Sequence, residues 1–240
     1  MATISLEQIK VAFSVAADVY ARQIGPIAAA KQLESKAKLN INSAKDFIDQ
    51  YRCMVEGTVF KRSLSAAALA YVLPEIERTR GERTADNAVA ATWLHVAYYE
   101  GFARSRLGKL RATIDQFQAA RGQHSSAMIE ECRFMADVAQ SVRDGTAARR
   151  MRLKTANPIP DQVEVKTKVY VRNTDVVAEV LDRASGYCEG CLSAAPFNRK
   201  SDGTPYLEVH HRVQLSEGGT DTVENAIALC PNCHRSAHHG

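Results

Sequence analysis

Apolar side chains recur every three to four residues through most of the first 144 residues, which is the spacing of one face of an α-helix. The first such stretch runs from Leu6 to about Gln23, where Gly25 and Pro26 interrupt it, and Pro26 suits the first turn of the next helix. Pro74 is expected to kink or shorten a later helix. The pattern predicts an all-helical N-terminal domain, with further helices starting near 42 and spanning 65–79, 84–103, 109–120 and 125–143.

The pattern changes after residue 144. Residues 145–172 hold seven Lys and Arg against two Asp and Glu (7 − 2 = +5), whereas residues 1–144 carry +3 and residues 173–240 carry −4. Two prolines, at 158 and 160, break any long helix here, so we interpret residues 145–162 as a basic linker. Its arginines, Arg149 and Arg150 among them, are either merely solvated or lie along a polyanion backbone.

The last part of the chain has the pattern of a small mixed domain. Alternating apolar and polar residues over 163–171 predict a strand, and 175–184 predicts a short helix. Glycines then separate short segments, which is typical of a domain too small to be stabilised by a hydrophobic core alone. The expected fold class is α+β: a helical domain at 1–144, the linker at 145–162, and a small metal-stabilised domain at 163–240.

Composition limits the class of protein. The 240 residues are 45% hydrophobic and 24% charged, which excludes a mostly disordered, collagenous or coiled-coil chain. The first twenty residues do not read as a secretory signal, and no apolar run reaches the roughly 18 residues of a membrane span. We therefore expect a cytoplasmic protein without a membrane partner.

Four of the six cysteines form two Cys-x-x-Cys pairs, Cys188 with Cys191 and Cys230 with Cys233. Two such pairs can hold one ion tetrahedrally through four thiolates, and Zn2+ is the expected metal in a structural site of this kind. A redox pair or unrelated buried thiols are the alternatives. Cys53 and Cys132 lie in helical stretches without a partner pattern, so we interpret them as small buried apolar residues.

Histidines gather beside the second cysteine pair. His210 and His211 are neighbours on a predicted strand, so their side chains point to opposite faces and serve different roles. His234 and His238 are four residues apart, which places them on one face of a helix starting near Pro231. The spacing predicts a second metal site, with surface histidines beside a zinc ribbon as the alternative.

The stretch from Cys188 to His238 contains Glu-Val-His-His, a Gly-Gly turn, an Asn and Cys-Pro-Asn-Cys-His-x-x-x-His. It resembles the HNH (ββα-metal) endonucleases of the McrA type, modification-dependent restriction enzymes of bacteria. The resemblance implies that three histidines hold a catalytic divalent ion, that His211 is the general base, that Asn225 orients His211 or its loop, and that Glu208 supports the site. The three implied ligands are His210, His234 and His238.

Such a site suits phosphodiester hydrolysis. A neutral imidazole accepts a proton from water near pH 7, and one divalent ion neutralises the scissile phosphate. Three imidazoles accept Mg2+, Mn2+, Co2+ or Ni2+, so the sequence leaves the ion open.

A basic stretch in the N-terminal domain, Lys61 and Arg62, lies just ahead of a predicted helix start and forms a candidate anion site. Residues 39–62, which include this pair, and residues 95–100 are similar to helical sulfur-binding domains that precede HNH modules and recognise phosphorothioated DNA, and the similarity covers about residues 5–104. A domain that recognises phosphorothioate needs a shallow apolar pocket surrounded by cations. Pro26 and Ala29 are candidates for the apolar wall, and Arg52, with Lys61 and Arg62, is a candidate for the charge. A purely structural role for these residues, and 5-methylcytosine as the mark, are the alternatives.

Together these features predict a type IV-like, modification-dependent restriction endonuclease. Its expected partner is double-stranded DNA that carries a modification, most simply phosphorothioate, and its expected location is the bacterial cytoplasm, at the nucleoid when bound. Cutting both strands with one site per chain is simplest for a homodimer. A non-catalytic zinc-containing DNA-binding module and a nuclease without modification preference are the competing interpretations.

Overall fold

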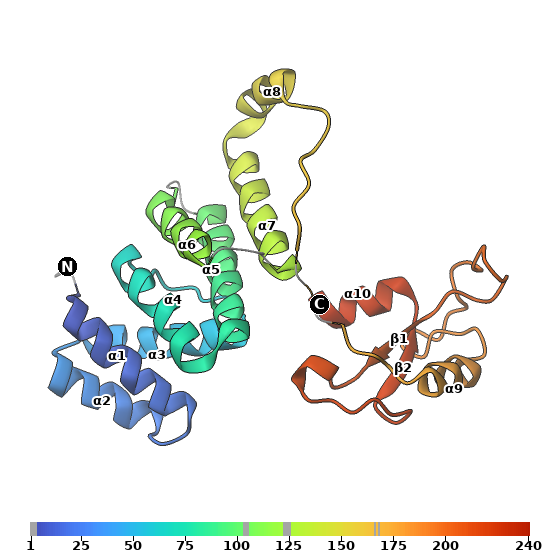
Figure 1. Ribbon diagram of the computed structural model, residues 1–240, viewed down its shortest axis with the longest axis horizontal. Helices are drawn as coiled ribbons and strands as arrows, with labels where there is room; N and C mark the ends of the chain where they lie inside the picture. Colours follow the sequence, from blue (N-terminus) through green and yellow to red (C-terminus); the bar gives the residue numbers. More distant parts are fainter. Residues whose placement is uncertain (1–3, 103–105, 122–125, 166, 168) are drawn as a thin grey trace. The chain divides into compact units, whose positions relative to one another are not determined.

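The computed structural model describes residues 4–102, 106–121, 126–165, 167 and 169–240. The chain divides into two compact units, Met1–Thr167 and Lys168–Gly240. Among the described residues, the regular secondary structure of the first unit is entirely helical, and the second unit contains a small two-stranded sheet (Figure 1). The α+β fold class is therefore confirmed.

Eight helices make up the described part of the first unit, and their starts and ends follow local sequence signals. Ser5 and Gln8 form a capping box, Pro26 occupies the first turn of its helix, and Gly57 ends another with a φ of 73°. The helices are α1 (Leu6–Tyr20), α2 (Pro26–Ala37), α3 (Ile41–Glu56), α4 (Ala66–Arg80), α5 (Glu82–Phe102), α6 (Gly108–Ala120), α7 (Ala127–Arg143) and α8 (Gly145–Thr155).

Helices α1 to α7 match the predicted ones within a few residues, although Ala103 and Ser125, at the ends of two expected helices, lie outside the described residues. Pro74 does not shorten α4, which continues to Arg80. The side chain of Pro74 is exposed, so water can satisfy the backbone group that loses its partner.

Helix α5 is central to the first unit, because it packs against α3, α4, α6 and α7. Four of its buried residues are alanines, and small side chains let neighbouring helices approach closely. Near its C-terminal end the fully buried Glu100 accepts hydrogen bonds from Arg111 and Arg143, and Arg111 also pairs with Asp137. This ion-pair network satisfies charges that would otherwise be costly to bury.

The segment expected to link the domains begins as a helix. Helix α8 packs on α7, and none of its described residues is buried. No strand is present among the described residues of 163–171, so that prediction is wrong. Val169 and Val171 are 81% and 100% exposed, and no neighbouring strand supplies the backbone hydrogen bonds that an isolated strand lacks.

The second unit is a hairpin-like sheet flanked by two helices. Its elements are α9 (Thr174–Ala184), β1 (Glu208–His211), the 3-10 helix η1 (Leu215–Glu217), β2 (Ala226–Leu229) and α10 (Pro231–His239). β1 and β2 are antiparallel, with His210 opposite Ile227 and His211 opposite Ala226. Its core is a small cluster that includes Val180, Leu207 and Ala228. Across the described helices of both units, none combines the length and apolarity of a membrane span.

Candidate metal centres and active site

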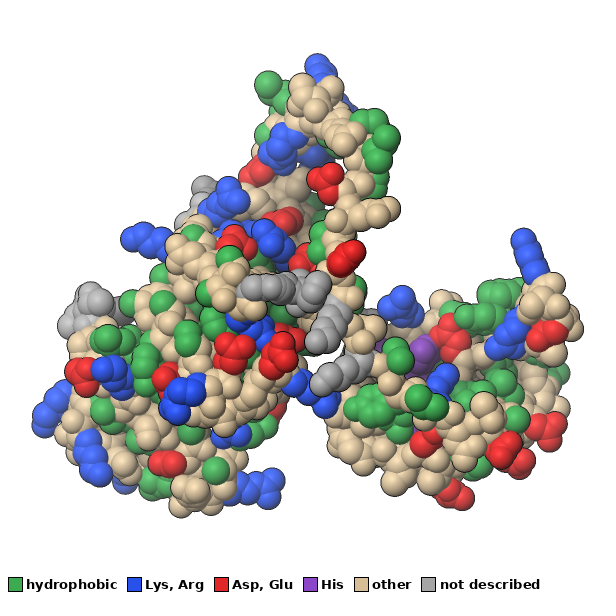
Figure 2. All heavy atoms as spheres, in the orientation of Figure 1, with side chains coloured by type: hydrophobic (Ala, Val, Ile, Leu, Met, Phe, Trp, Pro, Cys, Tyr) green, Lys and Arg blue, Asp and Glu red, His purple; other side chains and the backbone are tan. Residues whose placement is uncertain are grey.

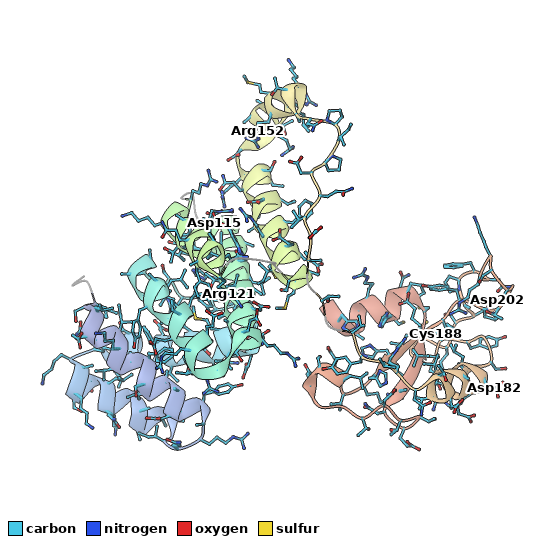
Figure 3. All side chains as sticks on the ribbon, in the orientation of Figure 1. Asp115, Arg121, Arg152, Asp182, Cys188 and Asp202 are labelled. Atoms are coloured by element: carbon cyan, nitrogen blue, oxygen red, sulfur yellow. The ribbon has the colours of Figure 1, made fainter. Side chains whose placement is uncertain are left out.

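The four cysteines of the two Cys-x-x-Cys pairs converge in the second unit. Their sulfur atoms all lie within 4.8 Å of one another, although the pairs come from segments about forty residues apart (Figure 3 labels Cys188). A side chain at Gly190 would place its Cβ 2.9 Å from the Leu229 side chain, so any larger residue here requires Leu229 to shift. Four converging sulfur atoms fit one metal ion.

Local hydrogen bonds favour the metal-binding form of Cys188. Burial by itself raises the pKa of this thiol, but backbone N–H groups of Cys230, Cys191 and Gly190 outweigh burial and lower its pKa to about 6. The N–H of Cys230 lies 3.1 Å from the Cys188 sulfur. The fold therefore prepares a thiolate at the centre of the cluster.

A second cluster joins β1 to α10. One ring nitrogen from each of His210, His234 and His238 lies within 4.8 Å of the other two, so the structure joins the pair predicted from spacing to the histidine implied by the resemblance. The Nε2 atoms of His234 and His238 are 3.2 Å apart. Burial, followed by the neighbouring imidazoles, lowers the pKa of His210, so it stays neutral, which is the form that binds a cation.

Glu208 sets the orientation of one of these imidazoles. Its carboxylate accepts a hydrogen bond from His234 Nδ1 and another from the Tyr206 hydroxyl at 2.9 Å. Burial opposes ionisation of Glu208, but these two hydrogen bonds outweigh it and lower its pKa. With Nδ1 engaged, His234 presents Nε2 to the cluster, a common arrangement around protein-bound metals.

His211 lies on the opposite face of β1 from the cluster and is nearly buried. Its Nε2 is 2.8 Å from Asp221 Oδ1, and Asp221 Oδ2 accepts the backbone N–H of Asn173. The Asn173 N–H, followed by His211, lowers the pKa of Asp221. An ionised Asp221 requires His211 Nε2 to be the donor, which leaves Nδ1 as a lone pair able to accept a proton.

Sequence reasoning missed Asp221. The only signal for it was a carboxylate in the polar turn between His211 and Asn225, and many exposed turns carry one.

Asn225 holds the loop that follows β1 and makes no hydrogen bond to His211 among the described contacts. Its side chain accepts the Val213 N–H at 2.9 Å and donates to the carbonyls of Val213 and Thr220 at 2.9 and 2.7 Å. Gly219 closes the same loop, where an added Cβ would lie 1.9 Å from the Val213 oxygen. Of the two roles expected for Asn225, the geometry matches the loop.

The candidate DNA-reading residues of the first unit are only partly brought together. Pro26 and Arg52 line one cavity of about 620 Å³ between α1, α2 and α3. Ala29 is fully buried in the core and is not part of the described lining of that cavity. The rest of the described lining is apolar, basic or acidic: Ala16, Val19, Tyr20 and Ile48; Arg22 and Lys45; Asp49 and Glu56.

The remaining basic candidates lie outside that lining. Lys61 is 5.8 Å from the ring centre of Tyr98, and Arg62 lies 3.8 Å from Asp46 with its side chain 77% exposed. On α8, Arg149 donates to the Ser141 carbonyl and Arg150 is exposed.

The second unit carries an HNH endonuclease domain. Residues 188–240 match the family model for HNH endonuclease, and this stretch contains both clusters, His211 and Asp221. The predicted resemblance of this region to McrA-type HNH proteins is confirmed.

Two relatives share parts of the chain. The type IV methyl-directed restriction enzyme EcoKMcrA of Escherichia coli (strain K12) is 54% identical over 80 residues, which are 33% of this chain and 28% of that enzyme. Anaredoxin of Nostoc sp. (strain PCC 7120 / SAG 25.82 / UTEX 2576) is 36% identical over 50 residues, which are 21% of this chain and 58% of anaredoxin. The chain thus matches well under two thirds of either relative's length.

Proposed function

We propose that the protein is a type IV-like restriction endonuclease that binds modified DNA and hydrolyses its phosphodiester bonds with one metal ion. The observation that carries this proposal is the arrangement on β1, with a three-histidine cluster on one face and the His211–Asp221 pair on the other, inside a stretch that matches HNH endonucleases. A hydrogen-bonded imidazole and carboxylate beside a candidate metal site is the arrangement that a general base requires, which supports an enzyme over a binding module.

The residues divide the work as follows. His210, His234 and His238 hold a divalent ion, Mg2+, Mn2+, Co2+ or Ni2+, which when bound neutralises charge on the scissile phosphate. Cys188, Cys191, Cys230 and Cys233 hold a structural Zn2+.

His211 supplies the base. Asp221 fixes the ring so that Nδ1 accepts the proton of the attacking water, and the same carboxylate stabilises the imidazolium that results. Asn225 keeps the following loop in place, and Glu208 keeps His234 in its binding orientation.

We propose that the first unit reads a phosphorothioate. The cavity at Pro26 and Arg52 combines apolar walls with three cations, and the acidic residues Asp49 and Glu56 bind Arg52 at 2.7 Å. Sulfur is larger and less hydrated than oxygen, so an apolar wall beside a cation suits it better than a fully polar site does. Lys61, Arg62, Arg149 and Arg150 are then backbone contacts to the duplex.

5-Methylcytosine is the second candidate mark. It is favoured by the description of EcoKMcrA as methyl-directed, whereas the cavity at Pro26 has a single aromatic residue, Tyr20, in its described lining. A flipped base is usually held between aromatic or apolar side chains, so this cavity suits a phosphate edge better.

The remaining partners follow from the reaction. Two copies of the chain would supply one site for each strand of the duplex. We place the protein in the bacterial cytoplasm, at the nucleoid when bound to DNA.

Four matched duplexes test the proposal: unmodified, 5-methylcytosine, 5-hydroxymethylcytosine and phosphorothioate, each incubated with the full chain in Mg2+ and in Mn2+. We expect the wild-type chain to cleave the phosphorothioate duplex alone. The His211→Ala variant should still bind this duplex but should not cleave it. Cleavage of only the methylated duplexes would retain the nuclease and reject the sulfur reader. Cleavage of none, or full activity of His211→Ala, would reject the proposed mechanism.

A matched pair of variants tests the reader by itself. Arg52 and Arg78 each pair with a carboxylate three residues earlier on their helix, so replacing either with Ala removes one cation from a similar ion pair. We expect Arg52→Ala to weaken binding to the modified duplex by about tenfold, the value of one charged hydrogen bond, and Arg78→Ala to leave it unchanged.

A further inference from the structure

Three alternate residues of one extended segment, Tyr206, Glu208 and His210, share a side of the second unit. Burial alternates from residue 206 to 211, so that these three are partly exposed while the residues between them are buried. Successive side chains of an extended chain point to opposite sides, so a phenol, a carboxylate and an imidazole follow one another on the same side. The imidazole belongs to the three-histidine cluster. Figure 2 shows histidine and acidic side chains next to each other at the surface of this unit.

Two hydrogen bonds connect the phenol to the cluster. The Tyr206 hydroxyl donates to Glu208 Oε1 at 2.9 Å, and Glu208 Oε2 accepts from His234 Nδ1. Each carboxylate oxygen therefore has its own partner, and the bond from Tyr206 restrains the carboxylate from turning away from His234. His234 Nε2 then stays on the side of the other imidazoles, 3.2 Å from Nε2 of His238.

Neighbouring groups hold the ring of Tyr206 in place. Its centre lies 4.6 Å from the ring centre of Phe197 and 4.9 Å from the guanidinium carbon of Arg199. Arg199 is itself fixed, because it donates to the carbonyls of Pro205 and Leu207 at 2.7 and 2.9 Å. The Tyr206 N–H donates to the Phe197 carbonyl at 2.9 Å and closes the same loop. Stacking, the nearby cation and the backbone bond together leave the phenol few other positions.

This aromatic pair is separate from the apolar packing of the second unit. The core cluster found among the described residues includes Leu207 but neither Phe197 nor Tyr206. Phe197 is also 53% exposed, so its contact with Tyr206 removes little apolar surface from water. The defined result of this contact is the direction in which the Tyr206 hydroxyl points.

We propose that Tyr206 is a positioning residue of the three-histidine site, which acts through Glu208 to hold His234 in the orientation that binds the divalent ion. Loss of an outer partner weakens metal binding, because the imidazole must then be ordered when the ion arrives. The inference rests on the proposed function, since it requires an ion at this cluster. It concerns affinity for the ion and is therefore measured without DNA.

Binding of Mn2+ to the zinc-loaded full chain, followed by loss of the free-ion signal in electron paramagnetic resonance, measures this effect. Mn2+ stands at the weak end of the affinity order of divalent metals, so it leaves zinc in the four-cysteine site. We expect Tyr206→Phe, which keeps the stacked ring and removes the hydroxyl, to weaken Mn2+ binding about tenfold with unchanged zinc content. Tyr187→Phe is the matched control: it removes a phenol hydroxyl from the same unit, at a residue 57% exposed, and should bind Mn2+ as the wild type does.

A double variant separates positioning from an independent structural role. If Tyr206 acts through Glu208, adding Tyr206→Phe to Glu208→Ala should cause no further loss of Mn2+ affinity. Wild-type affinity in Tyr206→Phe, loss of its zinc, or additive losses in the double variant would each overturn the proposal.

His210→Ala tests the underlying metal site separately, and it should abolish Mn2+ binding. A wild-type chain that binds no Mn2+, or a His210→Ala chain that binds it as the wild type does, would reject the three-histidine site of the proposed function and this inference with it.

Discussion

The two units of this protein differ in the interactions that stabilise each of them internally. The helical unit buries a large continuous set of apolar side chains from seven helices, with α5 at its centre. The second unit buries only a small cluster around β1, β2 and α9, and two groups of side chains that could each hold a metal ion lie in the same unit. The comparison shows where each unit is vulnerable: the helical unit to cavities in its core, and the second unit to loss of its ligands.

The largest expected effect is that of removing the four-cysteine site. Chelation, or Cys188→Ser, should unfold the second unit and leave the helical unit folded, because structural zinc contributes on the order of 10 kcal/mol to small domains. Circular dichroism should keep most of the helical signal, while the separate unfolding transition of the second unit disappears. Cys132→Ser, a buried thiol of α7, is the control and should retain full zinc content. Loss of both units together would show that they fold as one.

A substitution that creates a cavity in the helical unit should destabilise that unit and leave the second unit unaffected. Leu69 is fully buried, so Leu69→Ala should lower the free energy of unfolding of the helical unit by about 2 to 5 kcal/mol. Urea unfolding measures this change, and zinc content should not alter. Leu153→Ala, at a side chain 66% exposed, should change the free energy of unfolding by less than about 0.5 kcal/mol.

Asp221→Asn tests the pair that sequence reasoning missed. The variant should reduce kcat by about 100-fold with little change in KM, because the amide no longer fixes the Nε2–H form of His211. If Asp221 acts through His211, the double variant with His211→Ala should be no slower than His211→Ala alone. Additive losses would instead indicate an independent structural role. Asp202→Asn, an exposed carboxylate of the same unit, should leave kcat unchanged.

The smallest expected effect is a pH dependence in the helical unit. His95 is fully buried against Phe60, and burial lowers its pKa from the ordinary 6.5 despite the bond to the Phe60 carbonyl. The unfolded chain therefore binds a proton first, and the free energy of unfolding should fall as pH drops below about 6.5 towards the lowered value. Urea unfolding at pH 7 and pH 5 should show a smaller decline in His95→Gln than in the wild type.

Local patterns were sufficient to predict most of the helical unit and both clusters. Ser5, Pro26 and Gly57 act on their own neighbours, so helix ends follow from the sequence. Ligand spacings such as Cys-x-x-Cys and His-x-x-x-His are similarly local, whereas His210 was assigned to its cluster through the resemblance to HNH endonucleases.

Long-range contacts account for the differences. The alternation at 163–171 predicts a strand only if a second strand pairs with it, and the sequence contains no signal for its absence. Asp221 reaches His211 because the loop between β1 and β2 folds back, and Ala29 points into the core because of how α2 packs. Single-sequence patterns do not report either contact.

One helix connects the two clusters of the second unit. Cys230 caps the start of α10, its carbonyl accepts the His234 N–H at 2.9 Å, and Cys233 immediately precedes His234. The thiolate site therefore fixes the first turn of the helix that carries two of the three clustered imidazoles. Any change that loosens the four-cysteine group should therefore also move the clustered imidazoles apart, so we expect the two groups to form and to be lost together.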